Sequence, residues 1–375
     1  MPPGARRAGM TSVKEVRVER EPGAADDPAA EPGEGRFVFS DDYSVFDWGR
    51  MPDAVPDKGA SLCTMGAHNF ELLEVNHVPT HYRGVHEEPD DDGEPLELGD
   101  CEVAPRAMAI ELTRTPDLPY VGEATDEAVD PGAVRAGYDY GAYHAAAGDD
   151  YLIPLEVVFR NVVPVGSSLR DRGSPADYGL DLDGDEWPAE PVELPRPIVE
   201  FSTKFEEQDR YLGRADAEAI AGAAELNRLE ELALAVNHVV SREARKAESG
   251  GLVHEDGKIE CRYRDGEIQV ADVVGTLDEN RFAHDGQELS KEVIRQYYRR
   301  EHPEWVDAVA AAKREAGERG VADWRELCAV EPPALPDDVI ATVSGMYGAA
   351  TNAYTRSTWF DAPELGEVVG TIRAL

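Results

Sequence analysis

Two long segments with different hydrophobic periods set the strongest limit on how this chain folds. Residues 151–163, YLIPLEVVFRNVV, are almost continuously apolar and rich in β-branched side chains, which is typical of a buried strand. Residues 215–251 place apolar side chains at helical spacing, and Gly250 and Gly251 predict where that helix ends. Its apolar stripe consists of Leu229, Leu232, Val236, Val239 and Val240. We therefore expect a fold that combines a sheet with long helices.

Shorter patterns predict how strands and helices are ordered along the chain. Further strands are expected at residues 13–18, 36–40, 80–85, 106–114 and 194–205, and a β-hairpin is expected over residues 256–272. Further helices are expected at residues 60–76, 290–302 (with Ser290 at the N-cap) and 332–354. Strands mostly precede helices in the first half, and the hairpin lies among helices in the second. This order favours the α+β class.

The chain has 375 residues, which is long enough for two domains with their own cores. Residues 1–9, MPPGARRAG, are expected to be a disordered extension, with Met10 as an alternative start. Residues 115–149 are rich in Tyr, Gly and Asp and have no clear period, so they predict an insertion on the surface.

The chain is strongly acidic, with 76 acidic residues against 37 basic residues and a formal net charge of −39. At low salt such a surface repels itself, whereas at molar salt the Debye length falls to about 3 Å and the repulsion is screened. Because the acidic residues are spread over the whole chain, we interpret them as adaptation to the salt-rich cytoplasm of an extreme halophile. The alternative is an acidic tail for a basic partner. Nucleic acid is not expected as a partner, since phosphate binding needs basic patches.

Neither a membrane span nor a secretory signal is predicted. No apolar run approaches the roughly 18 residues that a membrane helix needs, and the first residues lack an apolar segment. We therefore expect a cytoplasmic protein with no membrane partner. The cysteines are scattered, and no pair of them has the spacing of metal ligands. A disulfide framework is not expected in a chain of this size. The cysteines are Cys63, Cys101, Cys261 and Cys328.

Lysine is rare in this chain, with seven lysines against thirty arginines. If lysine is selected against on the surface, the lysines that remain are enriched for function. Three of them lie in helical patterns and are expected to be solvated: Lys246, Lys291 and Lys313. The other four lie in strands or loops beside glycine, acids or hydroxyls and are candidates for anion contacts: Lys14, Lys58, Lys204 and Lys258.

The hairpin DGKIECRYRDGEIQVAD, residues 256–272, has an unusual polar pattern. A two-residue turn at Asp265-Gly266 pairs Glu260 with Ala271, so Lys258 and Glu260 share one face of the strand. Asp272 then falls on the opposite, apolar face. If both carboxylates hold one metal ion, either a bulge shifts the register or the strand ends just before Asp272.

Four stretches contain residue types that suit phosphate and metal binding: residues 41–59, 153–168, 200–209 and 256–282. Arginine, serine hydroxyls and backbone N–H groups can cradle a phosphate, while lysine and carboxylates can hold a polyphosphate and its Mg²⁺. Each stretch also has a structural interpretation, as a self-capped loop, an arginine ion pair at a strand end or a solvated loop. Taken singly, they indicate no more than a nucleotide enzyme.

Together and in this order, the four stretches resemble the SAICAR synthetase family, the phosphoribosylaminoimidazole-succinocarboxamide synthases. The resemblance covers residues 12–355. It rests on the patterns D-x-S-x-F-D with P-x-K-G, I-P-x-E-x-V-x-R-N with G-S, P-x-x-E-F with S-T-K, and D-x-K-x-E with G-E-x-x-x-x-D and D-x-x-R-F. The matching residues are Asp42, Ser44, Phe46, Asp47, Pro56, Lys58, Gly59, Ile153, Pro154, Glu156, Val158, Arg160, Asn161, Gly166, Ser167, Pro197, Glu200, Phe201, Ser202, Thr203, Lys204, Asp256, Lys258, Glu260, Gly266, Glu267, Asp272, Asp278, Arg281 and Phe282.

The resemblance implies a fold of two lobes with the ATP site between them. Residues 10–150 would form a β-rich N-terminal lobe that binds ATP, and residues 151–375 a mixed α/β lobe that binds substrate and Mg²⁺. It also implies an ATP-dependent ligase of purine biosynthesis. Such an enzyme joins L-aspartate to the carboxylate of carboxyaminoimidazole ribonucleotide (CAIR), through an acyl phosphate, and releases SAICAR, ADP and phosphate.

The resemblance also assigns roles to residues. Lys258, Glu260 and Asp272 form the catalytic group, in which Lys258 contacts the ATP phosphates and the two carboxylates hold Mg²⁺. ATP is further bound by Lys14 and by an adenine-binding hinge made of the backbone of Leu152, Ile153 and Pro154. The CAIR phosphate and the rest of the substrate side are bound by Arg160, Ser167, Ser168, Arg281, Lys204, Asp209, Asp47 and Lys58.

Some alternatives stay open at this point. The family's N-terminal phosphate loop has the form G-K-x-R-x-x-Y, and its nearest counterpart here is SVKEVRV, around Lys14. Either Ser167 or Ser168 can take the serine role. Two other functions also remain: a ligase for a different acid and amine, or a non-catalytic relative that binds nucleotide. The presence of both Glu260 and Asp272 favours catalysis.

Overall fold

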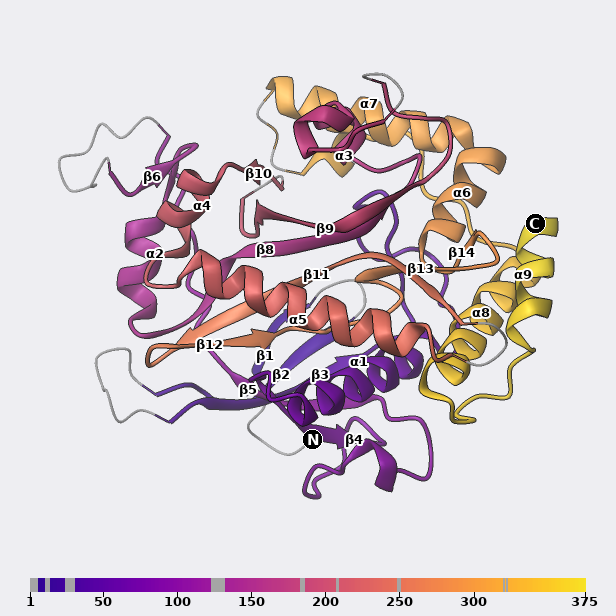
Figure 1. Ribbon diagram of the computed structural model, residues 1–375, viewed down its shortest axis with the longest axis horizontal. Helices are drawn as coiled ribbons and strands as arrows, with labels where there is room; N and C mark the ends of the chain where they lie inside the picture. The colour runs from indigo at the N-terminus through magenta and orange to yellow at the C-terminus, as the bar shows by residue number, and fades with distance from the viewer. Residues whose placement is uncertain are drawn as a thin grey trace.

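The fold consists of two antiparallel sheets with helices packed on them (Figure 1). The computed structural model describes residues 14–23, 31–122, 132–182, 186–206, 209–247, 251–319, 321 and 323–375, together with the backbone of residues 6–10. The first sheet has the order β1-β2-β3-β5-β4. Its strands are β1 (Arg6–Met10), β2 (Lys14–Arg20), β3 (Gly33–Phe39), β4 (Tyr82–His86) and β5 (Ala107–Leu112).

The second sheet has the order β10-β9-β8-β11-β13-β14, and β12 pairs with β11 beside this path. Its strands are β8 (Asp150–Val163), β9 (Val192–Thr203), β10 (Tyr211–Leu212), β11 (Val253–Arg264), β12 (Glu267–Ala271), β13 (Asn280–His284) and β14 (Gln287–Glu288). A separate small pair consists of β6 (Val134–Arg135) and β7 (Tyr138–Asp139).

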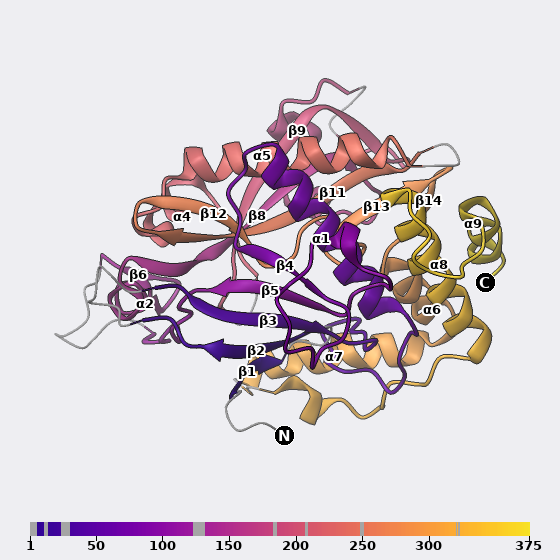
Figure 2. The ribbon, with the colours of Figure 1, turned by 90° about the horizontal axis from the view of Figure 1, so that it is seen from below.

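Helices cover the two sheets and extend the C-terminal half (Figures 1 and 2). The α-helices are α1 (Lys58–Val75), α2 (Tyr140–Ala147), α3 (Leu169–Arg172), α4 (Arg214–Ala221), α5 (Leu226–Ala244), α6 (Glu292–Glu301), α7 (Pro303–Arg319), α8 (Asp337–Thr355) and α9 (Leu365–Ala374). Short 3₁₀ turns are η1 (Leu98–Asp100), η2 (Pro175–Tyr178) and η4 (Trp324–Leu327). No helix in the described part of the chain is long and apolar enough to cross a membrane.

The two sheets lie side by side and are joined by backbone hydrogen bonds (Figure 2). Thr80, before β4, bridges Val270 of β12, and Arg114, after β5, bridges Tyr151 of β8. The N–H of Leu152 donates to the carbonyl of Arg114 at 3.0 Å. The first sheet is therefore fixed along the edge of the second sheet at the point where β12 ends.

Helix α5 packs its apolar stripe on β8 and β11 (Figure 1). All five residues of the predicted stripe are buried. Burial of each such side chain stabilises the fold by about 1.5–3 kcal/mol. They belong to one hydrophobic cluster that also includes Phe37 of the first sheet and Ile372 of α9. The two predicted lobes thus share a continuous core.

Most predicted elements are present. The structure confirms the strands that correspond to β2, β3, β4, β5, β8 and β9, the β11–β12 hairpin, and the helices α1, α6 and α8. Ser290 does not occupy the N-cap position of α6, which begins at Glu292, but its hydroxyl accepts a hydrogen bond from the Glu292 N–H at 3.1 Å. Helices α7 and α9 were not predicted.

The prediction of one helix over residues 215–251 is wrong. The segment forms two helices, because α4 ends at Gly222 and α5 begins at Leu226 and ends at Ala244. Gly222 has a φ of +69°, a backbone conformation that other residues rarely adopt. The ring of His144 also lies where its Cβ would be, at 2.6 Å.

Two other predictions need correction. Residues 6–9 of the predicted disordered extension belong to β1 (Arg6–Met10), which pairs with β2, whereas residues 1–5 lie outside the described part. The predicted surface insertion, residues 115–149, is not all on the surface. Its last part forms β7 and α2, and Tyr140 and Tyr143 are buried in the main core. Their rings supply the apolar area that the irregular sequence pattern did not show.

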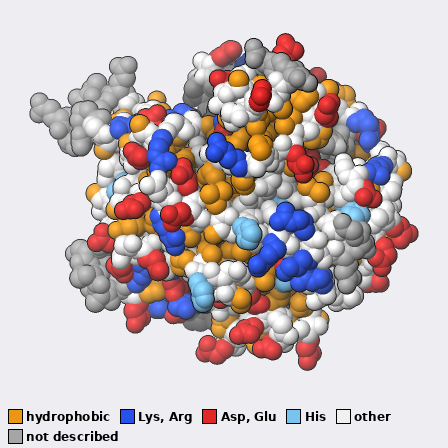
Figure 3. Space-filling model, viewed as in Figure 1, with side chains coloured by type: hydrophobic (Ala, Val, Ile, Leu, Met, Phe, Trp, Pro, Cys, Tyr) orange, Lys and Arg blue, Asp and Glu red, His pale blue; other side chains and the backbone are white. Residues whose placement is uncertain are grey.

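Charge is unevenly distributed on the surface. On the face that carries α5 in Figure 1, Asp and Glu side chains lie largely toward the rim, and a group of Lys and Arg side chains lies near the middle (Figure 3). The net charge of −39 therefore does not exclude local cationic areas.

We expect the break at Gly222 to be sensitive to a single methyl group. Gly222→Ala should lower the free energy of unfolding by about 1–2 kcal/mol, the cost of a left-handed backbone, before any clash with His144. The control is Gly366→Ala in α9, where nothing lies within 4 Å and alanine should stabilise the helix. Urea unfolding measures both changes, and equal effects would contradict this explanation.

Candidate active site

The β11–β12 hairpin has the register that the sequence predicts, with Glu260 opposite Ala271. Asp265 and Gly266 have φ values of 50° and 86°, the left-handed pair of a type I′ turn. Strand β12 ends at Ala271, and Asp272 itself has a φ of 62°. The second of the two predicted solutions is therefore correct. The strand ends just before Asp272. Because the Asp272 backbone is left-handed, its carboxylate does not point to the apolar face that strand alternation would assign to it.

Glu260 and Asp272 interact electrostatically in the folded chain. Burial and the neighbouring Asp272 raise the pKa of Glu260 to about 7. Burial alone would also raise the pKa of Asp272, but the ammonium groups of Lys14 and Lys204 hold it well below its usual range. Lys14 pairs with Asp272, and Lys204 pairs with Glu260. The two carboxylates, which strand alternation would place on opposite faces of the hairpin, are therefore held by neighbouring lysines.

The two carboxylates fit a magnesium ion bound together with phosphate. The second oxygen of Glu260, Oε2, is buried and has no hydrogen-bond partner in the structure, so one ligand position faces inward unsatisfied. Within the described residues no group of three or more His, Cys, Asp and Glu side chains forms a complete metal cage. Mg²⁺ commonly binds one or two carboxylates and takes its remaining ligands from phosphates and water. The donor set suits that type of site.

Lys258 lies between carboxylates from two other segments. Its Nζ is 2.5 Å from Glu156 of β8 and 3.3 Å from Glu279, which precedes β13. Burial opposes the charged form, but Glu279, Glu156 and Glu260 raise the pKa of Lys258 well above its usual range. Sequence reasoning gave no role to Glu279. Its only signal was its place next to Asp278 in the D-x-x-R-F pattern.

Lys58 is fully buried at the start of α1. Its Nζ lies 2.9 Å from Asp278, which also accepts a 2.6 Å hydrogen bond from the hydroxyl of Tyr347. Despite burial, Lys58 and Lys291 hold the pKa of Asp278 below its usual value. The prediction that Lys291 is merely solvated is wrong, because it is half-buried beside this carboxylate.

The start of β8, predicted as the adenine hinge, contains an irregularity. Between the pairs Glu260–Glu156 and Arg262–Leu152, three residues of β8 oppose one residue of β11, and the register shifts. The shift falls on Ile153, Pro154 and Leu155. The carbonyl of Leu152 accepts a hydrogen bond from the hydroxyl of Tyr143 at 2.8 Å. The strand therefore bulges beside Glu260.

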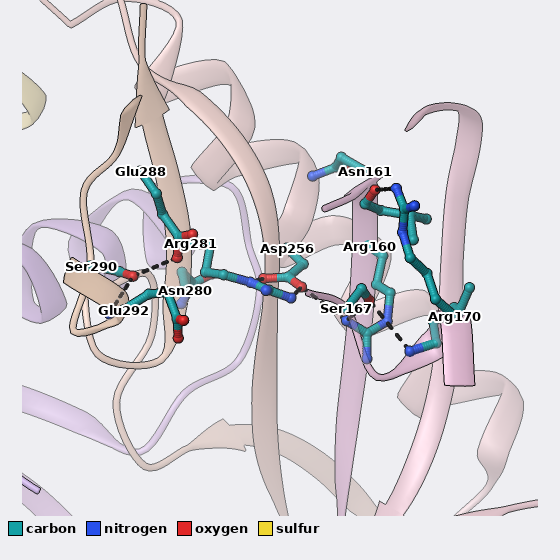
Figure 4. A network of polar contacts seen from close by, with 12 residues as sticks. Arg160, Asn161, Ser167, Arg170, Asp256, Asn280, Arg281, Glu288, Ser290 and Glu292 are labelled. Carbon is teal, nitrogen blue, oxygen red and sulfur yellow. Dashed lines mark hydrogen bonds and ion pairs between the residues drawn. The ribbon is translucent and has the colours of Figure 1, made fainter. Parts of the chain in front are cut away.

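A second cationic cluster lies at the other end of β8 (Figure 4). Arg160 donates to Asp256 at 2.9 Å, and Arg281 donates to the same carboxylate through Nε at 2.8 Å. Ser167 is buried, with its hydroxyl 3.5 Å from Arg160, whereas Ser168 is exposed. Of the two serines, Ser167 lies with the arginines. The structure thus brings Arg160, Ser167 and Arg281 together around Asp256.

Three residues that sequence reasoning did not place in the site complete this cluster. Glu200 accepts a 2.9 Å hydrogen bond from Arg160 and two bonds from Arg172, at 2.6 and 3.0 Å. Arg160 also donates to the hydroxyl of Tyr211 at 3.0 Å, and the Arg172 guanidinium stacks on the Tyr211 ring at 3.5 Å. Glu200 had appeared only as a pattern residue.

A neutral polar network supports this cluster from behind. His254 donates through Nε2 to the Asn280 amide oxygen and accepts at Nδ1 from Ser241, both at 2.9 Å. A Cβ at Gly257 would lie 1.9 Å from that amide oxygen, so only glycine fits beside Asp256. Asn161 donates to the carbonyl of His254 at 3.1 Å.

Asp209 and Asp47 lie on the side of Lys258 and Lys204. Partial burial, followed by the neighbouring Glu156, raises the pKa of Asp209, and Asp47 contributes in the same direction. The Asp47 side chain is 82% exposed and pairs with Lys313 at 2.5 Å. Asp209 therefore lies within electrostatic range of Asp47, Lys258 and Lys204.

Comparison with known proteins identifies the family. The SAICAR synthetase family profile matches residues 29–312, well over half of the chain. The chain belongs to the SAICAR synthetase family. It is 40% identical over 373 residues to an Archaeoglobus fulgidus protein to which phosphoribosylaminoimidazole-succinocarboxamide synthase is assigned, covering 97% of this chain and 99% of that protein. It is 30% identical to the synthase of Thermoplasma volcanium, covering 86% of this chain and 93% of that protein.

A solved structure of the SAICAR synthetase family shares the fold. The SAICAR synthase from Saccharomyces cerevisiae, solved in complex with SAICAR, aligns with a TM-score of 0.58 at 20% identity. The alignment covers 96% of this chain and 98% of the yeast chain. The expected α+β fold is therefore shown for the whole molecule. The family profile ends at residue 312, within α7, so η4, α8 and α9 lie beyond it.

We expect His254 to make stability depend on pH. Burial lowers its pKa from 6.5 to about 4, so between these values the unfolded chain binds a proton that the folded chain does not. The unfolding free energy should fall as the pH drops through this window, by about 3 kcal/mol from His254. Urea unfolding of the wild type and His254→Gln at constant salt measures the difference. The same pH slope in both proteins would contradict the assignment.

Proposed function

We propose that this SAICAR synthetase family member joins L-aspartate to the carboxylate of CAIR at the expense of ATP, forming SAICAR, ADP and phosphate. One observation carries the proposal. Glu260 and Asp272 interact electrostatically, although strand alternation would place them on opposite faces of the hairpin. Three lysines lie around them: Lys14, Lys204 and Lys258. A paired-carboxylate site rich in cations suits a metal-bound polyphosphate.

The chemistry needs activation, since a free carboxylate is a poor electrophile. A CAIR carboxylate oxygen attacks the γ-phosphorus of ATP, the bond to the ADP oxygen breaks, and an acyl phosphate forms. The aspartate amine then attacks the acyl carbon, loses a proton and expels phosphate. Glu260 and Asp272 would hold Mg²⁺, which when bound would neutralise phosphate charge. Catalysis is therefore mainly positioning and electrostatic stabilisation of the transferred phosphoryl group.

Lys258 is proposed to contact the ATP phosphates. Its carboxylate partners, Glu156 and Glu279, fix the position of the ammonium group. Lys14 is proposed to bind ATP from β2, where its Nζ lies 4.5 Å from the centre of the Phe37 ring. The adenine-binding hinge is proposed at the bulge of β8, with the backbone of Leu152, Ile153 and Pro154.

The Arg160 cluster is proposed to bind the CAIR phosphate. Asp256 orients both guanidinium groups, and Ser167 supplies a hydroxyl beside them. Paired arginines with a serine hydroxyl form a strong phosphate site because each bond is charge-assisted. The remaining substrate contacts are proposed for Lys204, Asp209, Asp47 and Ser168. Lys58 belongs to the same proposed group, but because it is buried it would act by holding Asp278.

The acidic composition supports a further proposal, that the enzyme works in the salt-rich cytoplasm of a halophile. Self-repulsion of a chain with a net charge of −39 is strong at low salt and screened at molar salt.

The proposed function is tested by ADP release from the purified protein in molar KCl with Mg²⁺. ADP should form at a steady rate only when CAIR, L-aspartate and ATP are all present, and SAICAR should appear in equal amount. Chelation of Mg²⁺ should abolish turnover, and tenth-molar KCl should reduce it. ADP release with another acid and amine, but none with CAIR and L-aspartate, would overturn the proposal.

We expect Lys258→Ala and Glu260→Gln each to reduce turnover by a factor of about 100 or more, as for other lost electrostatic contacts to a transition state. The matched controls are Arg228→Ala and Glu231→Gln, which break an exposed pair on α5 and should leave turnover unchanged. Circular dichroism checks that all four variants fold. Turnover within about threefold of the wild type in Lys258→Ala would count against its role.

A further inference from the structure

The loop between β3 and α1 contains two consecutive left-handed residues that are not glycine. Phe46 has a φ of 55° and Asp47 a φ of 60°, and Gly49 follows with a φ of 94°. Such a backbone persists only where surrounding contacts enforce it. Within the loop, the carbonyl of Val45 accepts a hydrogen bond from the N–H of Trp48 at 3.2 Å. The Ser44 hydroxyl also accepts a hydrogen bond from the Gly49 N–H at 3.3 Å, and contacts from outside the loop add to these two bonds.

Arg325 of η4 binds the backbone of this loop directly. Its Nε donates to the carbonyl of Trp48 at 2.6 Å, and its terminal nitrogen donates to the carbonyl of Asp47 at 3.0 Å. Asp323 fixes the arginine, because its carboxylate accepts from the Arg325 guanidinium at 2.9 Å and from the Arg325 N–H at 3.0 Å. The planar guanidinium therefore spans two successive carbonyls of the strained segment.

Side-chain contacts from α7 and η4 reinforce this grip. Lys313 places its Nζ 2.5 Å from the carboxylate of Asp47. The Trp48 ring lies edge-on between Trp305 and Trp324, with centroid distances of 5.8 and 5.6 Å. Phe46 packs edge-on against Trp305 at 5.6 Å. The strained loop is thus held by hydrogen bonds, an ion pair and aromatic packing at once.

The loop held in this way contains Asp47, one of the proposed substrate contacts. Asp47 is close enough to Asp209 to influence it electrostatically, and its side chain is 82% exposed. The residues that contact it from the C-terminal side are Trp305, Lys313, Trp324 and Arg325, and Asp323 fixes Arg325. All of them except Trp305 lie after residue 312, where the family match ends.

We propose that Arg325 and Lys313 are positioning residues that clamp the loop of residues 44–49 in the conformation that presents Asp47 to the substrate. Neither residue needs to contact substrate. Without the clamp, the loop relaxes from its left-handed conformation and Asp47 moves. The kinetic part of this inference rests on the proposed function, whereas the conformational part does not.

Limited trypsin digestion tests the conformational part without any substrate. Arg50 is an exposed cleavage site in this region, but the next residue, Met51, is 3% exposed, so cleavage there requires the segment to open. Arg325→Ala should raise the rate of cleavage after Arg50 about tenfold or more. Arg325→Lys, which retains one donor, should fall between this variant and the wild type. The control is Arg319→Ala in α7, whose side chain only pairs with Glu315 on the surface.

Steady-state kinetics tests the consequence for the reaction. Arg325→Ala and Lys313→Met should raise KM for CAIR or L-aspartate about tenfold, while KM for ATP and the thermal midpoint stay close to wild-type values. A purely structural role would lower the thermal midpoint and shift no single KM. An inactive wild-type protein would overturn the proposed function but leave the digestion result valid. Cleavage of Arg325→Ala at the wild-type rate would overturn the clamp.

Discussion

The ion pair between Lys14 and Asp272 connects the two halves of this molecule. Lys14 begins β2 in the first sheet, and Asp272 follows β12 in the second. The pair is largely removed from water, so the cost of burying each charge is offset only while both partners are in place. The ion pair lies at the same edge where backbone bridges join the two sheets. The position of the proposed ATP lobe relative to the metal carboxylates depends on this contact.

The same principle recurs in the other lysines of the site. Lys204, Lys258 and Lys58 each pair with a carboxylate inside the fold rather than with solvent. In a chain with a net charge of −39, these residues keep cationic groups directed at one place. An incoming polyphosphate can exchange with the carboxylates, because charge-assisted bonds to phosphate oxygens replace the bonds it displaces. Pairing of lysines with internal carboxylates thus explains how a strongly acidic protein can bind the anionic substrates proposed for it.

The site also depends on two departures from regular strand geometry. Asp272 leaves its strand in a left-handed conformation, and β8 bulges beside Glu260. Without the first, Asp272 would face the apolar side of the hairpin. Each departure stands next to ion pairs or packing that enforce it, as strained positions at functional sites require. The loop of Phe46 and Asp47 follows the same rule, with Arg325 as the enforcing contact.

The sequence by itself determined most of the strands, several helices and the family. Period and turn residues predicted the main strands, the α5 stripe and the hairpin register, since these depend on neighbours along the chain. Lysine scarcity pointed to Lys14, Lys58, Lys204 and Lys258, and all four lie against carboxylates that are buried or partly buried. The ordered patterns identified the family.

Only the tertiary structure decided which distant groups meet. Tyr211 and Arg172 have no local signal, and Glu279 has only its place in the D-x-x-R-F pattern. Their roles come from contacts between segments that are far apart in sequence. The break at Gly222 also depends on a ring from another helix. Local periodicity determines which face a side chain occupies, but long-range packing and charge pairing determine what it faces.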